Sequence, residues 1–484
     1  MTGIVTSSIP ESSGIPLNDT DSSAKSASPK VRSGYFTNLV TVFGGQIACA
    51  ALALLIEVCY ARFLGPDGRG QISLALMAVT VGVLLGGLGG EIPITVWTAD
   101  EKKNLSDWLP AVLFSGAIGC SVAICVWALA YWRWQALFFK GITPALFVLV
   151  LATIPAMILF GQLCAILAGS ERFRERAGIS FLEQLAGLIG IVGLVLLVRR
   201  NSEMALLGNL AGLMIGAGAA AWLLGKSLHG FGRITTAWKH VLPALSLGTR
   251  GQLGNLATFF NYRLDVFIVN AFLNPAQVGL YAVGVVVSEA LWQVPNAAAV
   301  ALLPRTARTL NDGSTMFTCS IVRQVLLIAC GSGLLLALVS PLVIPLVFGA
   351  AFRESVAVIW WILPGTIALC VGKVISADLV GRKKPQYSSI FALFSLAITV
   401  VLDVRLIPLM GIRGAALASS VAYFLNSFLL AAALKHELQV SWGMLLIPSR
   451  SEIATLLLAP QRLFSWIGKL PLSRAAAASS KSAL

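Results

Sequence analysis

The chain has 484 residues, of which 57% are hydrophobic and only 12% are charged, and its formal net charge is +14. A water-soluble protein of this length would need far more charge to cover its surface. The charges lie in short stretches between apolar runs of about 20 residues or more, the length that crosses a hydrocarbon core of roughly 30 Å as a helix. The composition therefore excludes a soluble globular protein and predicts an all-α polytopic membrane protein.

The positive charge and the cysteines exclude several kinds of site. No basic tract lies on a soluble domain, so the charge fits the excess of lysine and arginine in cytoplasmic loops better than a nucleic-acid partner. The eight cysteines lie in or beside apolar runs without a CxxC pair, which is typical of small hydrophobic side chains. LLGKSL at 223–228 lacks the first glycine of an ATP-binding loop, because position 220 is alanine. We expect no nucleic acid, no metal and no cofactor.

The chain begins with a serine-rich stretch, residues 1–34, that has no apolar core. This composition is typical of a disordered tail and not of a signal peptide. Lys25, Lys30 and Arg32 precede the first apolar run and favour a cytoplasmic location for the tail.

Twelve apolar runs follow and predict about twelve transmembrane helices. They cover approximately residues 36–63, 71–98, 108–132, 144–168, 178–199, 204–225, 246–272, 277–303, 320–347, 356–380, 387–408 and 412–434. Residues 436–484 are more polar and predict a cytoplasmic tail. With the amino terminus inside, the inner loops hold thirteen lysines and arginines and the outer loops nine, which predicts a multi-pass protein with both termini cytoplasmic.

The stretch LGPDGRG at 64–70 interrupts the first pair of runs and has an echo, LNPAQVG, at 273–279. The offset of 209 residues between them also relates Pro155 to Pro364. LAGSERF at 167–173 resembles LVGRKKP at 379–385 with an offset of 212. The matches predict an internal duplication with lobes at 35–230 and 231–435.

Six helices in each lobe make the repeat parallel about an axis along the membrane normal, which is a transporter architecture. LGPDGRG and LNPAQVG share only the leucine, the proline and the final glycine. We therefore interpret LGPDGRG as a turn and not as a phosphate-binding loop. Arg69 in this stretch stays a candidate contact at the outer mouth.

Polar side chains inside the spans are costly to bury and are therefore candidates for function. In the seventh span, Arg250, Asn261 and Asp265 lie within roughly 60° of one another on a helical projection. Arg263, Gln252 and Asn270 form a second stripe on the far side of the same helix. Two polar stripes predict a helix that borders a cleft on one face and its own bundle on the other. A structural pair between Arg263 and Asp265 is the alternative.

The eighth span carries Glu289, Gln293 and Asn296 at i, i+4 and i+7. A carboxylate at mid-membrane depth is a candidate proton or cation site. The alternative is a salt bridge from Glu289 to Arg263 or Lys373 that only ties helices together.

Two further spans carry charge. Glu57 in the first span lies within one residue of the repeat equivalent of Asp265. Lys373 and Asp378 share the tenth span, where Lys373 either faces substrate or pairs with Asp378. We group Glu57, Asp265, Glu289 and Asp378 as a predicted ion-coupling or charge network.

Two stretches of the sequence resemble a known family. ARFLGPDGRGQISLALM at 61–77 and NYRLDVFIVNAFLNPAQVGLYAVGVVVSEALWQVPNAAAVALLPR at 261–305 are similar to the polysaccharide-exporting, oligosaccharide-flippase branch of the multidrug/oligosaccharidyl-lipid/polysaccharide (MOP) superfamily. The similarity covers about residues 35–435. It implies a MATE-like fold of twelve helices in two six-helix lobes.

The resemblance also implies a function. Such a protein flips an undecaprenyl-diphosphate-linked oligosaccharide across the bacterial inner membrane for surface polysaccharide (exopolysaccharide) biosynthesis. Its partners would be membrane lipids and polysaccharide polymerase or assembly proteins, with H⁺ or Na⁺ as a coupling ion. Arginine suits a diphosphate because its guanidinium donates paired hydrogen bonds. The expected substrate-binding residues are Arg250, Arg263, Lys373, Asn261, Gln293 and Asn296.

Two other functions stay open. One is a same-fold exporter of another cargo, either a lipid-linked cell-wall precursor or a drug exchanged for a cation. The other is a membrane glycan polymerase or ligase, which typically needs a large outer loop. No loop here exceeds about 25 residues, so we expect a transporter and not an enzyme.

Overall fold

The computed structural model describes residues 32–100, 105–225, 238–308, 312–449 and 452. Throughout this part of the chain, the regular elements are helices and none is a strand. The predicted all-α membrane fold is therefore confirmed. Most of the two predicted tails, residues 1–31 and 453–484, lies outside the described residues.

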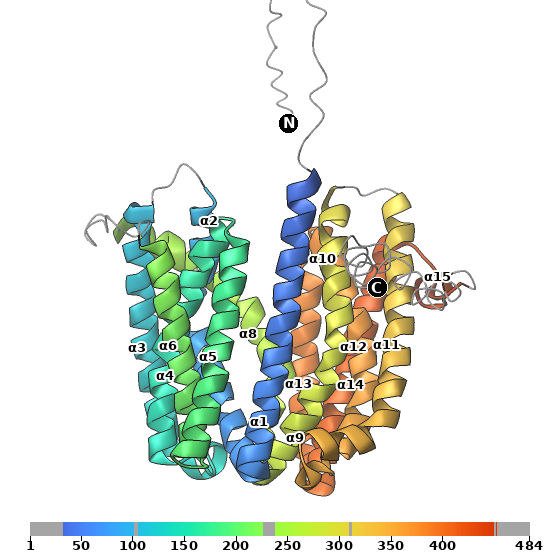
Figure 1. The fold of residues 1–484 in the computed structure, drawn as a ribbon. Coiled ribbons are helices and arrows are strands. Elements are labelled where there is room, and N and C mark those ends of the chain that lie inside the picture. Colours follow the sequence, from blue (N-terminus) through green and yellow to red (C-terminus); the bar gives the residue numbers. More distant parts are fainter. Residues whose placement is uncertain (1–31, 101–104, 226–237, 309–311, 450–451, 453–484) are drawn as a thin grey trace, which may run out of the picture.

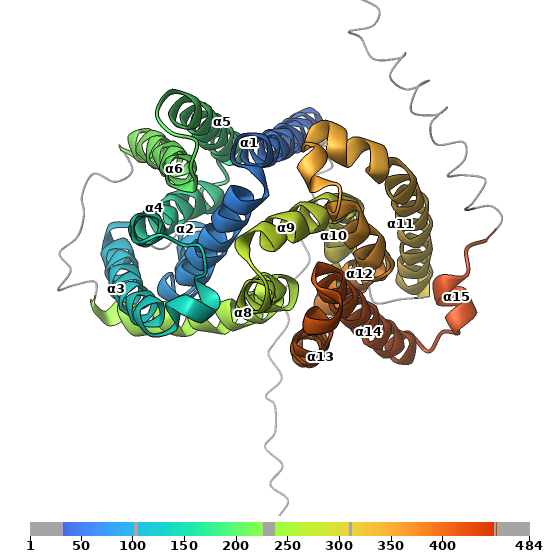
Figure 2. The same cartoon turned by 90° about the horizontal axis from the view of Figure 1, so that it is seen from below.

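The helices fall into two groups along the chain, which we call the first and second bundles. The first bundle contains α1 (Arg32–Gly86), α2 (Glu91–Thr98), α3 (Leu105–Phe138), α4 (Pro144–Gly169), α5 (Phe173–Leu197) and α6 (Ser202–Leu224). The second contains η1 (Trp238–His240), α8 (Val241–Phe272), α9 (Pro275–Glu289), η2 (Ala290–Trp292), α10 (Gln293–Arg308), α11 (Asp312–Val347), η3 (Ala350–Phe352), α12 (Ser355–Gly381), α13 (Gln386–Met410), α14 (Ile412–Leu438) and α15 (Trp442–Leu446). Figures 1 and 2 show the bundles side by side.

Helix α1 consists of two arms that meet at Gly65, whose φ of 67° and ψ of −174° are not helical. Arg69 forms an ion pair with Glu57, twelve residues earlier. In a continuous helix these residues would be about 18 Å apart along the axis, so the chain must reverse at Gly65. The turn predicted for LGPDGRG is therefore confirmed, and it is confined to one glycine with positive φ.

The number of crossings agrees with the sequence prediction. Ten described helices are long and apolar enough to span a membrane, and α1 is counted once among them. The second arm of α1 and the 32-residue α8, which is more polar, bring the number to twelve.

The internal repeat is visible in the backbone. Pro155 lies inside α4 and Pro364 inside α12. Glu171, just after α4, has φ 56°, and Lys383, just after α12, has φ 62°. These rare left-handed conformations lie 212 residues apart, the offset read from the sequence. The second crossing of each bundle is also interrupted, at 87–90 in the first and at η2 in the second.

The two bundles touch where the repeated turns meet. Helices α1 and α9 are among the most extensively packed pairs in the molecule. A methyl group on Gly70 would lie 1.7 Å from the carbonyl oxygen of Pro275, and one on Gly279 would lie 2.0 Å from that of Pro66. The backbones approach this closely only because both positions are glycine. Arg62 strengthens the junction, because its Nε donates to the carbonyl of Val347 at 2.8 Å.

At the opposite end of the molecule, α15 packs against α11. Arg323 on α11 contacts both oxygens of Glu452 at 2.7–3.1 Å. The bonds from Arg323 lower the pKa of Glu452 to about 2, so this attachment keeps its charge through the physiological range.

Candidate functional site

The second bundle contains a lysine held by aromatic rings. The ammonium of Lys373 on α12 lies 4.3 Å from the ring centre of Trp292 and 5.2 Å from that of Tyr262. The two rings are 5.1 Å apart, and Tyr262 in turn packs edge-on against Tyr423. Within the described residues, Lys373 forms no salt bridge. Cation–π contacts therefore position its charge and leave its N–H donors available.

Next to this lysine, Arg263 on α8 forms an ion pair with Glu289 at the end of α9. The second oxygen of Glu289 is buried and has no hydrogen-bond partner among the described residues. The sequence left open whether Arg263 pairs with Asp265 or with a neighbour, and the structure contains the pair with Glu289. Glu289 also interacts electrostatically with Lys373, so the guanidinium and the ammonium both lie near this carboxylate.

The other predicted substrate-binding residues differ in their exposure. Asn261, on the same helix as Arg263, is buried, and its carbonyl oxygen has no partner in the described part of the chain. Gln293 and Asn296 are exposed at the start of α10. Arg250 belongs to α8, but its side chain lies outside the described residues.

A second polar cluster surrounds Asp265. This carboxylate accepts hydrogen bonds from the hydroxyl of Tyr281, from Ser419 at 3.1 Å and from the backbone N–H of Val266 at 2.8 Å. Four helices supply or border these groups, namely α8, α9, α13 and α14.

Asp403 on α13 belongs to the same cluster and was missed from the sequence. It is fully buried, and neither carboxylate oxygen has a hydrogen-bond partner among the described residues. Its charged neighbour is Asp265. Asp403 lies in an apolar run, and a carboxylate in such a run is a candidate for function. Arg405, two residues later, makes the stretch resemble the charged end of a span, where a carboxylate is ordinary.

Two of the predicted network residues have structural partners. Asp378 is buried and accepts hydrogen bonds from Arg382 at 2.6 Å and Thr318 at 2.9 Å. The pairing of Lys373 with Asp378 that the sequence left open does not occur, because the two side chains contact different neighbours.

Glu57 pairs with Arg69, and Arg69 also donates to Ser73. The structure gives no support for an outer-mouth contact of Arg69, because its side chain is only 3% exposed and is bonded to Glu57 and Ser73.

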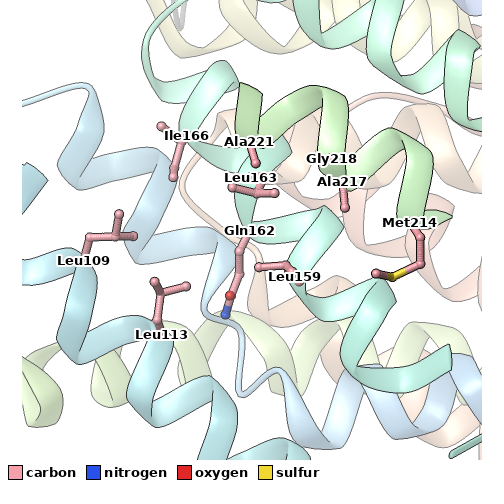
Figure 3. Close-up of a pocket in the computed structure, with 10 residues that line it drawn as sticks. All are labelled: Leu109, Leu113, Leu159, Gln162, Leu163, Ile166, Met214, Ala217, Gly218 and Ala221. Atoms are coloured by element: carbon pink, nitrogen blue, oxygen red, sulfur yellow. The ribbon is translucent and has the colours of Figure 1, made fainter. Parts of the chain in front are cut away.

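Two cavities share Gln162 in their lining. The larger, of about 350 Å³, lies between α3, α4 and α6 and is lined almost wholly by apolar side chains, with Gln162 as the exception (Figure 3). A smaller polar cavity of about 150 Å³ adjoins Gln162 at the interruption between α1 and α2. The first fits a hydrocarbon group and the second fits hydrogen-bonding groups.

Comparison with known proteins gives the family. The model of a family described as "Polysaccharide biosynthesis protein" matches residues 59–357, more than half of the chain. The chain belongs to this family. The resemblance to the polysaccharide flippase branch of the MOP superfamily is therefore confirmed.

A curated relative is the "Probable low-salt glycan biosynthesis flippase Agl15" of Haloferax volcanii, 22% identical over 272 residues. The match covers 55% of this chain and 56% of the relative, so the chain spans about half the length of the curated relative it matches.

Solved structures show the same fold. The lipid II flippase MurJ in an inward closed conformation superposes with a TM-score of 0.69 at 15% identity, over 83% of this chain and 87% of MurJ. An inward-facing multidrug resistance MATE family transporter of the MOP superfamily gives 0.61 at 13% identity, over 80% of this chain and 94% of its own. At these identities the likeness concerns the fold alone.

Proposed function

We propose that the protein flips an undecaprenyl-diphosphate-linked oligosaccharide repeat unit across the bacterial inner membrane for surface polysaccharide biosynthesis. Membership of a polysaccharide biosynthesis family supports a glycan cargo. The observation that carries the proposal is the pair of cations, Lys373 and Arg263, within membrane-spanning helices of the second bundle. Cations at such positions are costly and mark the path of a charged substrate.

The chemistry of the cluster fits a diphosphate. Lys373 rests on aromatic faces, so it meets a phosphate oxygen without first breaking a salt bridge. Arg263 would exchange the carboxylate of Glu289 for a phosphate, with which it forms paired hydrogen bonds. Movement of the head group requires no bond to break, and we therefore propose a transporter without enzymatic activity.

The test is a flipping assay with the purified protein in liposomes and a fluorescent undecaprenyl-diphosphate-linked sugar. Lys373→Ala should lower the initial rate at least about tenfold, because a hydrogen bond to a charged group is worth about 1.5–3 kcal/mol. Lys435→Ala is the matched control, since Lys435 also stacks on a tryptophan, Trp442 at 5.6 Å, but at the end of α14. Equal rates for wild type and Lys373→Ala would remove this lysine from the substrate path.

We further propose that Asp265 and Asp403 couple transport to H⁺ or Na⁺. A buried carboxylate without partners beside a second carboxylate favours a proton or a small cation. Asp403→Asn should abolish the stimulation of flipping by an imposed H⁺ or Na⁺ gradient. The exposed Asp67→Asn should leave that stimulation intact. A response of Asp403→Asn equal to that of wild type to both gradients would exclude this role.

A further inference from the structure

The second crossing of the first bundle is a broken helix. The second arm of α1 ends at Gly86, and α2 begins at Glu91. Between them, Leu88 and Gly89 adopt left-handed conformations, with φ of 48° and 67°. Irregular backbone at membrane depth occurs where it is buried in protein or borders a cavity, and broken helices in transporters commonly place backbone groups at a binding site.

A cavity lies against this break and between the two bundles. It has a volume of about 150 Å³ and is bordered by α1, α2 and α4 on one side and by α8 on the other. Its polar side chains are Glu91, Gln162, Gln252 and Asn255, and neither lysine nor arginine is among the described residues that line it. The described residues of the lining therefore offer amide donors and acceptors and one carboxylate, but no cation for a phosphate.

Gln162 on α4 is an incompletely bonded donor in this cavity. Its side chain is only 4% exposed, and its Nε2 has no hydrogen-bond partner among the described residues. Figure 3 shows the amide projecting from α4, between Leu113 and Leu159 in that view. A methyl group on Gly116 would lie 2.7 Å from this Nε2, and one on Gly90 would lie 3.4 Å from it. The absence of side chains at these two glycines leaves room for the amide beside the helix break. Burying its N–H without a partner costs free energy, and a hydrogen bond to a ligand oxygen would offset that cost.

The second bundle supplies the facing amides. Gln252 on α8 donates from Nε2 to the carbonyl of Leu84 at 2.9 Å, near the end of α1. Asn255, one turn later on α8, donates from Nδ2 to the amide oxygen of Gln252 at 3.4 Å. A group in this cavity would contact both bundles at once.

We propose that this cavity is a subsite for an uncharged hydroxyl or acetamido group of the glycan, separate from the Lys373 and Arg263 cluster that takes the diphosphate. This inference rests on the proposed function. Gln162 donates from Nε2 to a sugar oxygen, and the amide oxygens of Gln252 and Asn255 accept from sugar hydroxyls. The described residues of the lining present the Glu91 carboxylate and no lysine or arginine, which favours an uncharged group over a phosphate.

The experiment measures binding of two lipids to the full-length protein in nanodiscs: undecaprenyl diphosphate and undecaprenyl-diphosphate-N-acetylglucosamine. The wild type should bind the sugar-bearing lipid more tightly. Gln162→Leu should weaken binding of that lipid about three- to tenfold, the value of one to two hydrogen bonds, and leave the bare lipid unchanged. Met316→Leu, a volume-conserving change at an exposed position of α11 away from both cavities, should alter neither affinity.

Three results would overturn the subsite: equal binding of the two lipids by the wild type, an equal loss for both lipids in Gln162→Leu, or no loss for either. Gln252→Leu provides a second variant from the other bundle and should reduce the sugar preference in the same way. If the wild type binds neither lipid, the proposed function itself fails. These outcomes separate the two proposals.

Discussion

At the scale of single residues, Glu57 and Arg69 form the ion pair that closes the turn between the arms of α1. Arg69 is 3% exposed and the side chain of Glu57 is 22% exposed. Removing one partner leaves a buried charge unpaired, which costs more than losing the whole pair. The pair therefore stabilises the turn only while both residues are present.

We expect Glu57→Leu to destabilise the protein by about 3 kcal/mol, near the low end for a broken buried pair because Glu57 is partly exposed. The measurement is denaturant unfolding in detergent micelles. Glu57→Leu with Arg69→Leu should recover most of the loss, since no charge then remains buried. A single variant as stable as the wild type would show that Arg69 finds another partner.

Residue partners could be predicted only in part. Helical periodicity indicates which face of a span is polar, and it identified Asn261 and Asp265 as neighbours on α8. It cannot tell which other helix that face meets. Whether Glu289 forms its ion pair with Arg263 or with Lys373 depends on how α9 and α12 pack. The sequence therefore left both pairings open.

At the scale of elements, the contact between α1 and α9 depends on two glycines. A side chain at Gly70 or Gly279 would collide with backbone, which cannot rotate away as a side chain can. We expect Gly279→Ala to separate the bundles at the end where the two turns meet. Spin labels at the exposed positions Arg200 and Arg353, in a cysteine-free background, should report a longer distance by electron paramagnetic resonance.

Gly331→Ala is the matched control for this separation. Gly331 also lies within a long helix, α11, but a methyl group there would meet nothing within 4 Å. Its label distance should equal that of the wild type. An unchanged distance in Gly279→Ala would mean that α1 and α9 slide past each other without opening.

The sequence predicted most crossings but not their interruptions. The run at 71–98 reads as one apolar span, yet the structure divides it at 87–90. GGLGG at 86–90 allows the break because glycine adopts positive φ without strain. Glycines in a span equally permit close helix contacts, so composition alone could not choose between a break and a contact.

At the scale of the whole molecule, the repeat explains the architecture. The offset of 209 residues predicted that Pro66 and Pro275 are equivalent, and the structure places the two turns against each other. The sequence could not predict this contact, because a duplication relates two positions without stating that they touch. The two equivalent turns give the bundles one close junction, and we expect the bundles to rock about it.

The orientation of the chain in the membrane decides which end of the molecule faces the cytoplasm. The start of α1 and helix α15 lie toward the same end of the molecule (Figure 1), as an even number of crossings requires. The excess of lysine and arginine in the loops at that end predicts that it is cytoplasmic.

Helix α5 offers a matched pair of exposed positions, Arg174 in its first turn and Arg200 just beyond its last. In a cysteine-free background, Arg200→Cys should react with a membrane-impermeant maleimide in intact cells, and Arg174→Cys only after permeabilisation. The reverse pattern would place the termini outside, and it would turn the Gly70–Gly279 junction into an inner gate.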